Sequence, residues 1–246
     1  TKVYFFKKQN TLENFSEKPY IWLYWENKKD SEKPAYLNLC YKTVVRHCKE
    51  SFNIQLLDEK SVYNFLPDLR KDINELKIPQ KADYIRIFLL YKYGGIWLDS
   101  DIIVNKDLKP LYNKMDEQNV DYVGFGCHYK NCIDKGYPYP ANWVMISKKN
   151  TKFMKECLDA CNNYLDEYYI SELKHKKNYF IFGRKLLWKK IKSLKKRDNW
   201  DYYHYDSQCL DRDYNYKKIR NNRHLSEEKI DTNCEKTMFF TPIYNT

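Results

Sequence analysis

The sequence predicts an α/β fold in which helices flank a sheet, and three observations support this. Short apolar runs alternate with segments of helical periodicity along the 246 residues. No internal repeat, low-complexity tract or linker rich in Gly, Ser or Pro divides the chain. The length also suits one hydrophobic core, since single cores extend to about 250–300 residues. We therefore expect a single domain over residues 1–246.

The first three predicted elements lie in residues 21–57. Residues 21–25 form a short aromatic and β-branched run that is typical of a buried strand. Pro34 suits the first turn of a helix, and residues 52–57 follow as a second strand. The apolar residues of this helix recur at helical spacing and form one stripe: Leu37, Cys40, Tyr41, Val44 and Cys48.

A second helix and a strand meet at a pair of glycines. The helix begins near Gln80, and Gly94 and Gly95 end it because glycine readily takes the left-handed backbone that follows a helix. Residues 96–98 then form a strand, a polar triplet follows, and residues 102–104 resume the β pattern. Later strands are predicted at residues 122–125 and 143–146, and later helices at residues 153–165 and 186–194.

Composition restricts the class of protein. Lysine and arginine (44 residues) outnumber aspartate and glutamate (33), and the net charge of +11 should attract phosphates, acidic glycans or anionic lipid head groups. No apolar run approaches the roughly 18–20 residues of a membrane-spanning helix, and residues 1–8 are too short for the apolar core of a signal peptide. We expect a cytoplasmic or peripherally membrane-associated protein, or one of a secretory lumen if an anchor was trimmed.

The eight cysteines show no paired C-x-x-C set of the kind that builds a zinc site. Cys157 and Cys161 fall one helical turn apart on an apolar face, which is typical of small buried side chains. An even count would equally suit disulfides in a secretory lumen, so the cysteines leave the compartment open.

A pair of carboxylates follows the strand at residues 96–98. Asp99 and Asp101 stand at i and i+2, where an extended backbone points them the same way and lets them share one oxygen-preferring cation. Ligands of open α/β sheets bind beyond the carboxyl ends of strands, and Gly94 and Gly95 should keep side chains out of the approach. The alternative is a turn pair that caps backbone N–H groups. A second copy at residues 211–213 has no strand before it and contains Arg212.

Two quoted segments carry a family resemblance. Residues 81–86 read KADYIR, and residues 89–101 read LLYKYGGIWLDSD. Together they resemble the signature of the DXD-containing glycosyltransferase superfamily, which includes capsular polysaccharide synthesis proteins, yeast-type initiating mannosyltransferases and the glucosylating domains of clostridial toxins. Residues 21–25 (IWLYW) are most similar to the capsular polysaccharide group. The resemblance extends from about residue 20 to residue 147.

The resemblance implies a GT-A-type fold, a Rossmann-like mixed sheet flanked by helices. Residues 20–147 would form the nucleotide-sugar half, and residues 148–246 the acceptor-side and C-terminal helical part. The implied activity moves a sugar from a nucleotide-sugar donor, with UDP favoured over GDP, to a glycan or polysaccharide, with retention of configuration. Asp99 and Asp101 would bind the Mn²⁺ or Mg²⁺ ion that grips the donor diphosphate, with Ser100 in the donor-binding segment.

The preceding helix supplies two more residues by the same resemblance. Asp83 would hydrogen-bond hydroxyls of the donor sugar, and Arg86 would orient the donor or its phosphate; with Asp101 they make the implied catalytic set. The two are three residues apart and therefore share one helix face. Without the resemblance, they would be an ordinary surface ion pair.

The donor nucleobase and sugar would meet three further side chains. Trp22 matches the tryptophan that stacks on the base in toxin-like relatives, although Trp25 could take this part, or either indole could fill the core. Trp97 replaces a tyrosine common in the family, so its indole N–H would substitute for a hydroxyl that touches phosphate. Asn142 would face the sugar; its alternative is a turn residue that opens a strand.

Other functions make different sequence demands. A nucleotidyl- or phosphoryl-transferase would also use a carboxylate-bound cation, but the sequence contains no phosphate-binding glycine loop. A nucleic-acid-binding module would explain the charge and the 24 tyrosines, but no zinc finger, RRM or KH signature is present, and we expect no nucleic-acid partner. The basic residues 185–197 would form a solvated outer helix, or would dock on an anionic membrane or polysaccharide.

Overall fold

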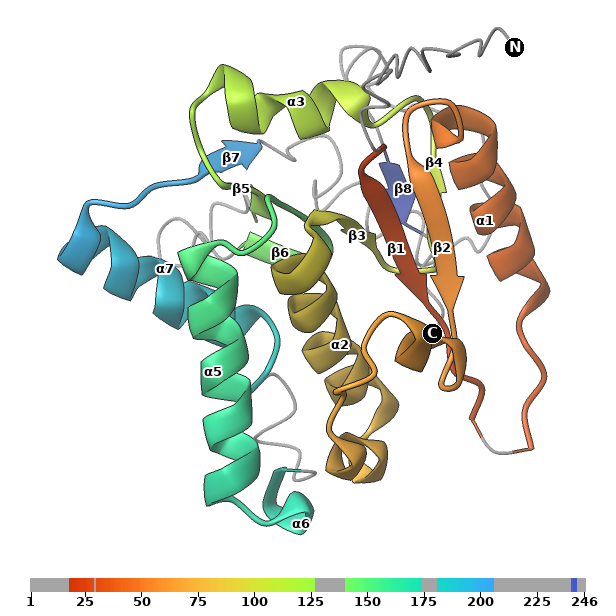
Figure 1. Ribbon diagram of the computed structural model, residues 1–246. Helices are drawn as coiled ribbons and strands as arrows, with labels where there is room; N and C mark the ends of the chain where they lie inside the picture. The colour runs from red at the N-terminus through yellow and green to blue at the C-terminus, as the bar shows by residue number, and fades with distance from the viewer. Residues whose placement is uncertain (1–17, 29, 127–139, 174–180, 206–239, 243–246) are drawn as a thin grey trace, which may run out of the picture.

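The computed structural model describes residues 18–28, 30–126, 140–173, 181–205 and 240–242, and it centres on one six-stranded sheet (Figure 1). The strand order is β2-β1-β3-β6-β5-β7, and a two-stranded sheet pairs β4 with β8. β1 is parallel to β2 and β3, whereas β6 is antiparallel to β3 and β5, so the large sheet is mixed. The strands are β1 Tyr20–Tyr24, β2 Asn53–Leu57, β3 Gly95–Leu98, β4 Ile102–Val104, β5 Tyr122–Gly126, β6 Pro140–Ser147, β7 Tyr203–Tyr205 and β8 Phe240–Pro242.

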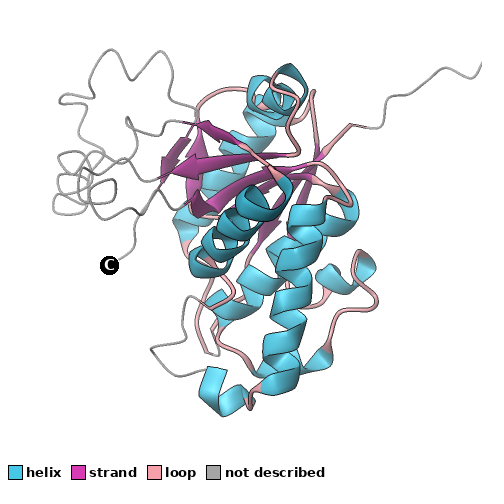
Figure 2. Ribbon diagram, turned by 90° about the vertical axis from the view of Figure 1, so that its left-hand side faces the viewer, coloured by secondary structure: helices cyan, strands magenta, loops and turns pink. Residues whose placement is uncertain are grey.

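Helices cover both faces of the sheet, as the edge-on view in Figure 2 shows. Successive side chains of a strand point to opposite faces, so each strand feeds two cores. Trp22 and Trp97 pack with residues of α2, α5 and α7, whereas Ile21 and Ile96 pack with residues of α1 and α3. The α-helices are α1 Ala35–Cys48, α2 Ile78–Tyr93, α3 Lys109–Glu117, α5 Lys152–Glu167, α6 Ile170–Leu173 and α7 Arg184–Asp198; 3-10 helices span Ser61–Asn64 and Lys71–Glu75.

The two glycines between α2 and β3 serve the backbone. Gly94 ends α2 with φ 66°, and Gly95 has φ 101°. A Cβ atom on Gly94 would lie 2.6 Å from the backbone N of Lys149, and one on Gly95 would lie 2.4 Å from the carbonyl oxygen of Tyr20. The glycines therefore let β3 start close to its neighbours. Since neither lines the cavity described below, the expectation that they clear its approach is wrong.

The predicted α/β architecture, a mixed sheet flanked by helices, is confirmed. The predicted strands and helices of residues 21–104, 122–146 and 153–194 appear with boundaries shifted by a few residues. Helix α3 and strand β7 were not predicted. The division into a nucleotide-sugar half and an acceptor half stays a prediction.

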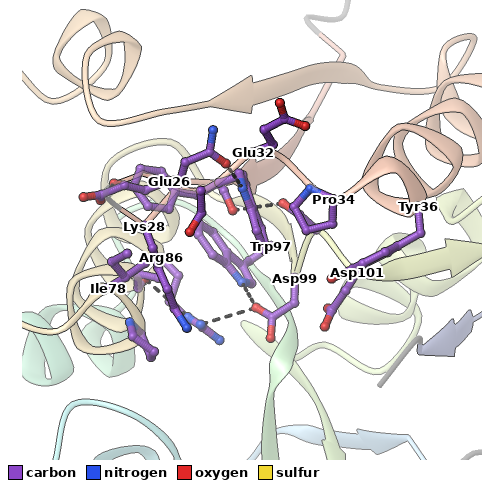
Figure 3. Close-up of a pocket in the computed structure, with 17 residues that line it drawn as sticks. Glu26, Lys28, Glu32, Pro34, Tyr36, Ile78, Arg86, Trp97, Asp99 and Asp101 are labelled. Atoms are coloured by element: carbon purple, nitrogen blue, oxygen red, sulfur yellow. Dashed lines mark hydrogen bonds and ion pairs between the residues drawn. The ribbon is translucent and has the colours of Figure 1, made fainter. Parts of the chain in front are cut away.

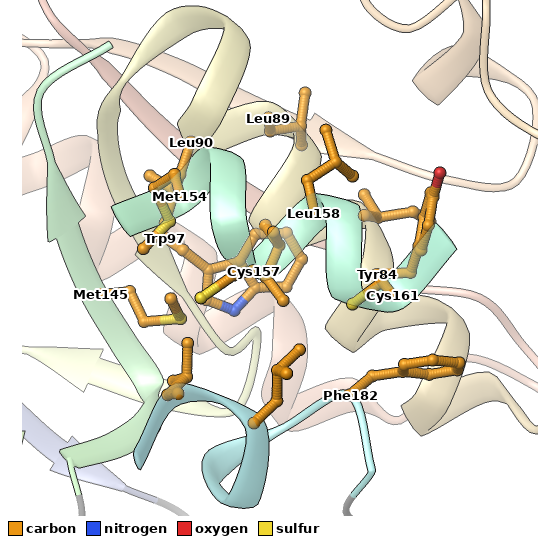
Figure 4. Packing of buried hydrophobic residues seen from close by; sticks show 14 of the residues in the cluster. Tyr84, Leu89, Leu90, Trp97, Met145, Met154, Cys157, Leu158, Cys161 and Phe182 are labelled. Atoms are coloured by element: carbon orange, nitrogen blue, oxygen red, sulfur yellow. The ribbon is translucent and has the colours of Figure 1, made fainter. Parts of the chain in front are cut away.

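The buried cysteines behave as small apolar side chains. Cys40, Cys48, Cys157 and Cys161 are free and buried. Cys157 and Cys161 of α5 pack in the cluster that joins α2, α5 and α7 (Figure 4). Cysteines 127, 132, 209 and 234 lie outside the described residues. In the part of the chain that the structure describes, no helix is both long and apolar enough to cross a membrane.

Candidate functional site

A cavity of about 600 Å³ opens where β1 and β3 end, within the usual size range of small-molecule sites (Figure 3). Its wall comes from four segments: residues 24–28 after β1, residues of the 31–36 segment that enters α1, the first turns of α2, and residues 97–101. Asp99, Ser100 and Asp101 all line it. The predicted polar triplet therefore lies on a cavity wall at the carboxyl edge of the sheet.

Two neighbours hold the Asp99 side chain by one oxygen. The indole Nε1 of Trp97 donates to Oδ1 over 2.9 Å, and the Arg86 guanidinium lies 3.3 Å from the same oxygen. No described residue forms a hydrogen bond or ion pair with Oδ2. Burial raises the pKa of Asp99, and the charge of Arg86 and the Trp97 bond work against that rise. Asp99 is thus fixed in orientation with one oxygen left over.

Asp101 lines the same cavity, and no described side chain forms a hydrogen bond or ion pair with its carboxylate. Burial raises its pKa to about 6, and the negative charge of Asp99 adds to the rise. Between the two aspartates, Ser100 is buried and its hydroxyl donates to the carbonyl of Tyr24 over 2.9 Å, which ties the triplet to the end of β1. Two buried carboxylates on one wall, where the charge of Asp99 raises the pKa of Asp101, form a place where a divalent cation would be stabilised.

The carboxylates of Asp99 and Asp101 suit a hard cation that takes its other ligands from a bound phosphate or from water. In the described residues, no group of three or more His, Cys, Asp or Glu side chains is arranged to hold a metal. Two carboxylates with free space before them match the way Mg²⁺ and Mn²⁺ bind through few protein oxygens and complete their shell with phosphate and water. Asp99 and Asp101 fit that pattern.

Asp83, Arg86 and Asn142 form a connected group behind the wall. Arg86 lies 3.1 Å from Oδ1 of Asp83, and the Asn142 amide donates to that same oxygen over 2.8 Å. Arg86 also donates to the carbonyl of Asn142. Asp83 and Arg86 are each 6 % exposed, so the alternative of a surface ion pair is wrong. Only Arg86 of the three lines the cavity.

Burial raises the pKa of the Asp83 carboxyl to about 6. The charge of Arg86 opposes this rise, and the charge of Asp99 adds to it. The Arg86 guanidinium therefore sits between two carboxylates that both need its charge. It also lies over the Trp97 ring, 4.9 Å from the centroid. Arg86 is the centre of the group.

The Trp97 indole does not offer its N–H to a phosphate. It is 1 % exposed, packs among Met145, Met154 and Cys157 (Figure 4), and gives its N–H to Asp99. The expectation that this N–H substitutes for a phosphate-binding hydroxyl is therefore corrected: the indole orients the carboxylate.

Trp22 lies in the core and not in the cavity. It is fully buried, stacks on Tyr20 with ring centroids 4.4 Å apart, and donates its N–H to the carbonyl of Gly94 over 2.8 Å. Its strand position points it to the α2 face, where Phe65 and Tyr93 also contact it. The expected contact of Trp22 with a donor base does not fit this placement.

Trp25, the alternative, is half-buried on the cavity wall. It also lines a second cavity of about 310 Å³ beside the carboxyl end of β2, together with Asn27, Asp58 and Glu59. Its indole N–H donates to the Asn27 side chain over 2.7 Å. The indole therefore stands between two open spaces.

Sequence reasoning missed two charged residues of the site. Glu26 lines the cavity and forms an ion pair of 2.6 Å with Lys81, which is 4 % exposed. Lys81 opens the quoted KADYIR segment, and Glu26 directly follows the first predicted strand. A lysine on the buried side of a helix was the signal that could have found the pair.

Residues 211–213, the second D-x-D copy, lie outside the described residues. Helix α7 buries its apolar side, including Leu187 and Ile191, in the core. Its basic side carries ion pairs such as Arg197 with Glu156. Helix α7 is thus an outer helix, and only its basic side is left for an anionic surface.

Comparison with protein families gives a match over nearly the whole chain. Residues 1–242 match the family described as capsular polysaccharide synthesis protein. A curated relative is inositol phosphoceramide mannosyltransferase 3 of Schizosaccharomyces pombe, 56% identical over 32 residues, which are 13% of this chain and 9% of that protein. The chain therefore matches only a small part of the relative's length.

Several solved structures are similar to this chain at low sequence identity. The PaToxG glycosyltransferase is 14% identical, with 84% of this chain and 75% of that chain covered and a TM-score of 0.47. The glycosyltransferase GlyE of Streptococcus pneumoniae is 15% identical, with 94% and 55% covered and a TM-score of 0.49. A glycosyltransferase involved in glycosylation of the major capsid of PBCV-1 is 13% identical, with 93% and 96% covered and a TM-score of 0.47.

Proposed function

Because the chain belongs to the capsular polysaccharide synthesis protein family, we propose that it is a metal-dependent glycosyltransferase that moves a sugar from a nucleotide-sugar donor to a glycan. The observation that carries the proposal is the presence of Asp99 and Asp101 on the wall of one cavity, with Arg86 beside them. The cavity is large enough for part of a sugar nucleotide.

The reaction needs positive charge at the leaving group. When the bond between the anomeric carbon and the diphosphate breaks, negative charge grows on the leaving phosphate. A Mn²⁺ or Mg²⁺ ion held by Asp99 and Asp101 would stabilise that charge as a Lewis acid. Trp97 and Arg86 hold Asp99 in one orientation, which preorganises the wall before the donor enters.

In this proposal, the first role of Asp83 and Asn142 is to position the Arg86 guanidinium. Both contact the guanidinium group and neither lines the cavity. Their predicted contact with the donor sugar remains part of the proposal, and it requires a movement that opens the wall at Arg86. The network that they form with Arg86 supports a shared role.

The donor proposal favours UDP-sugars, with GDP-sugars as the alternative. The stacking role expected of Trp22 passes to Trp25, which lines both cavities and is partly accessible. Base stacking on an indole contributes roughly 1–3 kcal/mol. Retention of anomeric configuration is proposed from the family resemblance, and NMR of the first-formed product would test it.

The acceptor and the membrane contact are proposed on charge. A net charge of +11 favours an acidic glycan or polysaccharide acceptor, and the basic side of α7 would support peripheral contact with an anionic membrane. Co-sedimentation with anionic and with neutral vesicles at rising salt concentration tests the membrane contact. Binding that is equal for both vesicle types would argue against it.

One panel experiment tests the function. UDP- and GDP-sugars are incubated with the chain in Mn²⁺, in Mg²⁺ and in EDTA, and the released nucleotide is identified. We expect a nucleoside diphosphate, released only with metal and lost in Asp101→Ala. Release of a sugar 1-phosphate would instead indicate nucleotidyl transfer, because that reaction breaks the bond between the two phosphates and moves the nucleoside monophosphate to the acceptor. Salt-dependent RNA or DNA binding that survives Asp101→Ala would favour a binding module.

A further inference from the structure

The Glu26 carboxylate is held rigidly on the cavity wall. Lys81 lies 2.6 Å from its Oε2 atom, and the hydroxyl of Tyr24 donates to the same atom over 2.6 Å. The Glu26 side chain is 18% exposed, and no described residue forms a hydrogen bond or ion pair with Oε1. One oxygen is thus anchored and the other remains available. Figure 3 shows Glu26 on the same wall as Trp97.

The lysine that holds Glu26 is itself buried. Lys81 belongs to α2, and its side chain is only 6% exposed. A buried ammonium group is costly unless a carboxylate compensates it, and a further bond of 3.3 Å to Asn74 satisfies another of its protons. A lysine kept inside the fold to hold one carboxylate indicates that the position of that carboxylate matters.

The chemistry of Glu26 selects its ligand. An ionised carboxylate only accepts hydrogen bonds, so it binds hydroxyl or N–H groups and repels phosphate. The diphosphate belongs near Arg86 and the Asp99–Asp101 pair, which leaves Glu26 for a neutral, hydroxyl-bearing part of the ligand. Trp25 adjoins Glu26 in the chain and lines the same cavity. With the nucleobase stacked on Trp25 as proposed above, the sugar part of the donor would lie near Glu26, and its hydroxyl groups are the donors that a carboxylate accepts.

We propose that Glu26 binds hydroxyl groups of a sugar ring of the nucleotide-sugar donor, and that Lys81 and Tyr24 are the positioning residues that hold it. The ring is either the ribose of the nucleotide or the transferred hexose. The assignment rests on the proposed glycosyltransferase function and adds to it the contact that recognises the ring.

The ribose is tested by calorimetric titration of the full chain in Mn²⁺ with UDP, 2′-deoxy-UDP and 3′-deoxy-UDP. For the wild type, we expect loss of the bonded hydroxyl to weaken binding by about ten-fold, as for a hydrogen bond to a charged group. Glu26→Gln should bind the ribo and deoxy forms almost equally. Tyr24→Phe, which removes only a hydroxyl, should reduce the preference without abolishing it.

The hexose is tested by the gain in affinity of UDP-glucose and UDP-galactose over UDP, in the same variants. Glu32→Gln is the matched control, because Glu32 is an exposed carboxylate on the same cavity wall. It should keep every wild-type preference. If Glu26→Gln loses the preference and Glu32→Gln keeps it, Glu26 binds a sugar ring. The titration in which the loss occurs then shows whether that ring is the ribose or the hexose.

The results that would overturn the role of Glu26 differ from those that would overturn the proposed function. If Glu26→Gln keeps the wild-type preferences in both titrations, or loses them no more than Glu32→Gln, Glu26 does not bind a sugar ring. A wild-type chain without any preference overturns the assignment as well. If the wild type binds none of these nucleotides, nor GDP or GDP-mannose, the proposed function itself fails, and this is seen before any variant is measured.

Discussion

The indole N–H of Trp97 lies 2.9 Å from the Oδ1 atom of Asp99, two residues further along the chain. The same indole is buried among side chains of α2 and α5. The hydrophobic core therefore sets the orientation of a carboxylate on the cavity wall, and a change in the core at this point should be felt in the reaction.

Trp97→Phe should keep the fold and reduce turnover. It removes the donor to Asp99 and leaves a space in the core, which costs about 1–3 kcal/mol of stability. We expect the turnover of the folded enzyme to fall by about ten-fold, as for one lost oriented hydrogen bond. Trp22→Phe is the control: it loses a comparable bond to Gly94 outside the cavity, and it should lower stability alone. Equal turnover in the two variants would contradict the orienting role.

Arg86→Met should destabilise the fold strongly. Asp83 and Asp99 would lose the guanidinium group that lies 3.1 Å and 3.3 Å from them. Removing one partner of a buried ion pair costs about 3–5 kcal/mol. Urea denaturation at pH 7 measures the loss. Adding Asp83→Asn to Arg86→Met should recover part of it, and a double variant no more stable than the single one would show that Asp83 does not depend on Arg86.

Stability should fall between pH 4 and pH 6 through Asp83. Burial raises its pKa from 3.8 to about 6, so the folded state holds the proton more tightly than the unfolded state. Between these two values the unfolded chain loses its proton first, and the free energy of unfolding falls as pH rises. The effect is about 3 kcal/mol, because the pKa rises by about 2.2 and each pKa unit corresponds to about 1.36 kcal/mol. Asp83→Asn should lack this part of the slope in urea titrations; an unchanged slope would contradict the burial of a carboxylate here.

Trp25→Ala should weaken nucleotide binding by about ten-fold, the low end of the contribution of base stacking. Calorimetry with UDP and GDP measures it. Trp22→Phe should leave the affinity of the folded protein unchanged, since Trp22 is fully buried away from the cavity. The reverse pattern would restore Trp22 as the residue that meets the base.

The local elements were predictable because hydrophobic spacing is a local property. The stripe from Leu37 to Cys48 repeats over three turns of α1, and its buried members predict the helix. Helix α3 was missed because it buries only Leu111 and Met115, which are too few to form a periodic pattern. Strand β7 was missed because it has only three residues, which are too few to show an alternating pattern.

The site was predictable in part. Asp99 and Asp101 follow a buried strand, and a strand delivers the residues after it to the edge of the sheet. Alternation along β1 places Trp22 and Ile21 on opposite faces, but it does not indicate that the strand ends at Tyr24 and that the cavity wall begins there, so the sequence could not choose between Trp22 and Trp25. The pair of Glu26 and Lys81 joins two elements far apart in the chain, and no local pattern records such a contact.

Asp99 and Asp101 are proposed to hold a divalent cation for a nucleotide-sugar donor. Calorimetric titration of Mn²⁺ into the chain with saturating UDP, for wild type and Asp101→Asn, tests it most directly. We predict one metal site in the wild type, weaker at pH 5 than at pH 7.5 because the pKa of Asp101 is raised to about 6 and a ligand must be deprotonated. Asp101→Asn should lose at least about ten-fold in affinity, as expected for loss of a charged metal ligand. Equal Mn²⁺ affinity in the two proteins would contradict the account.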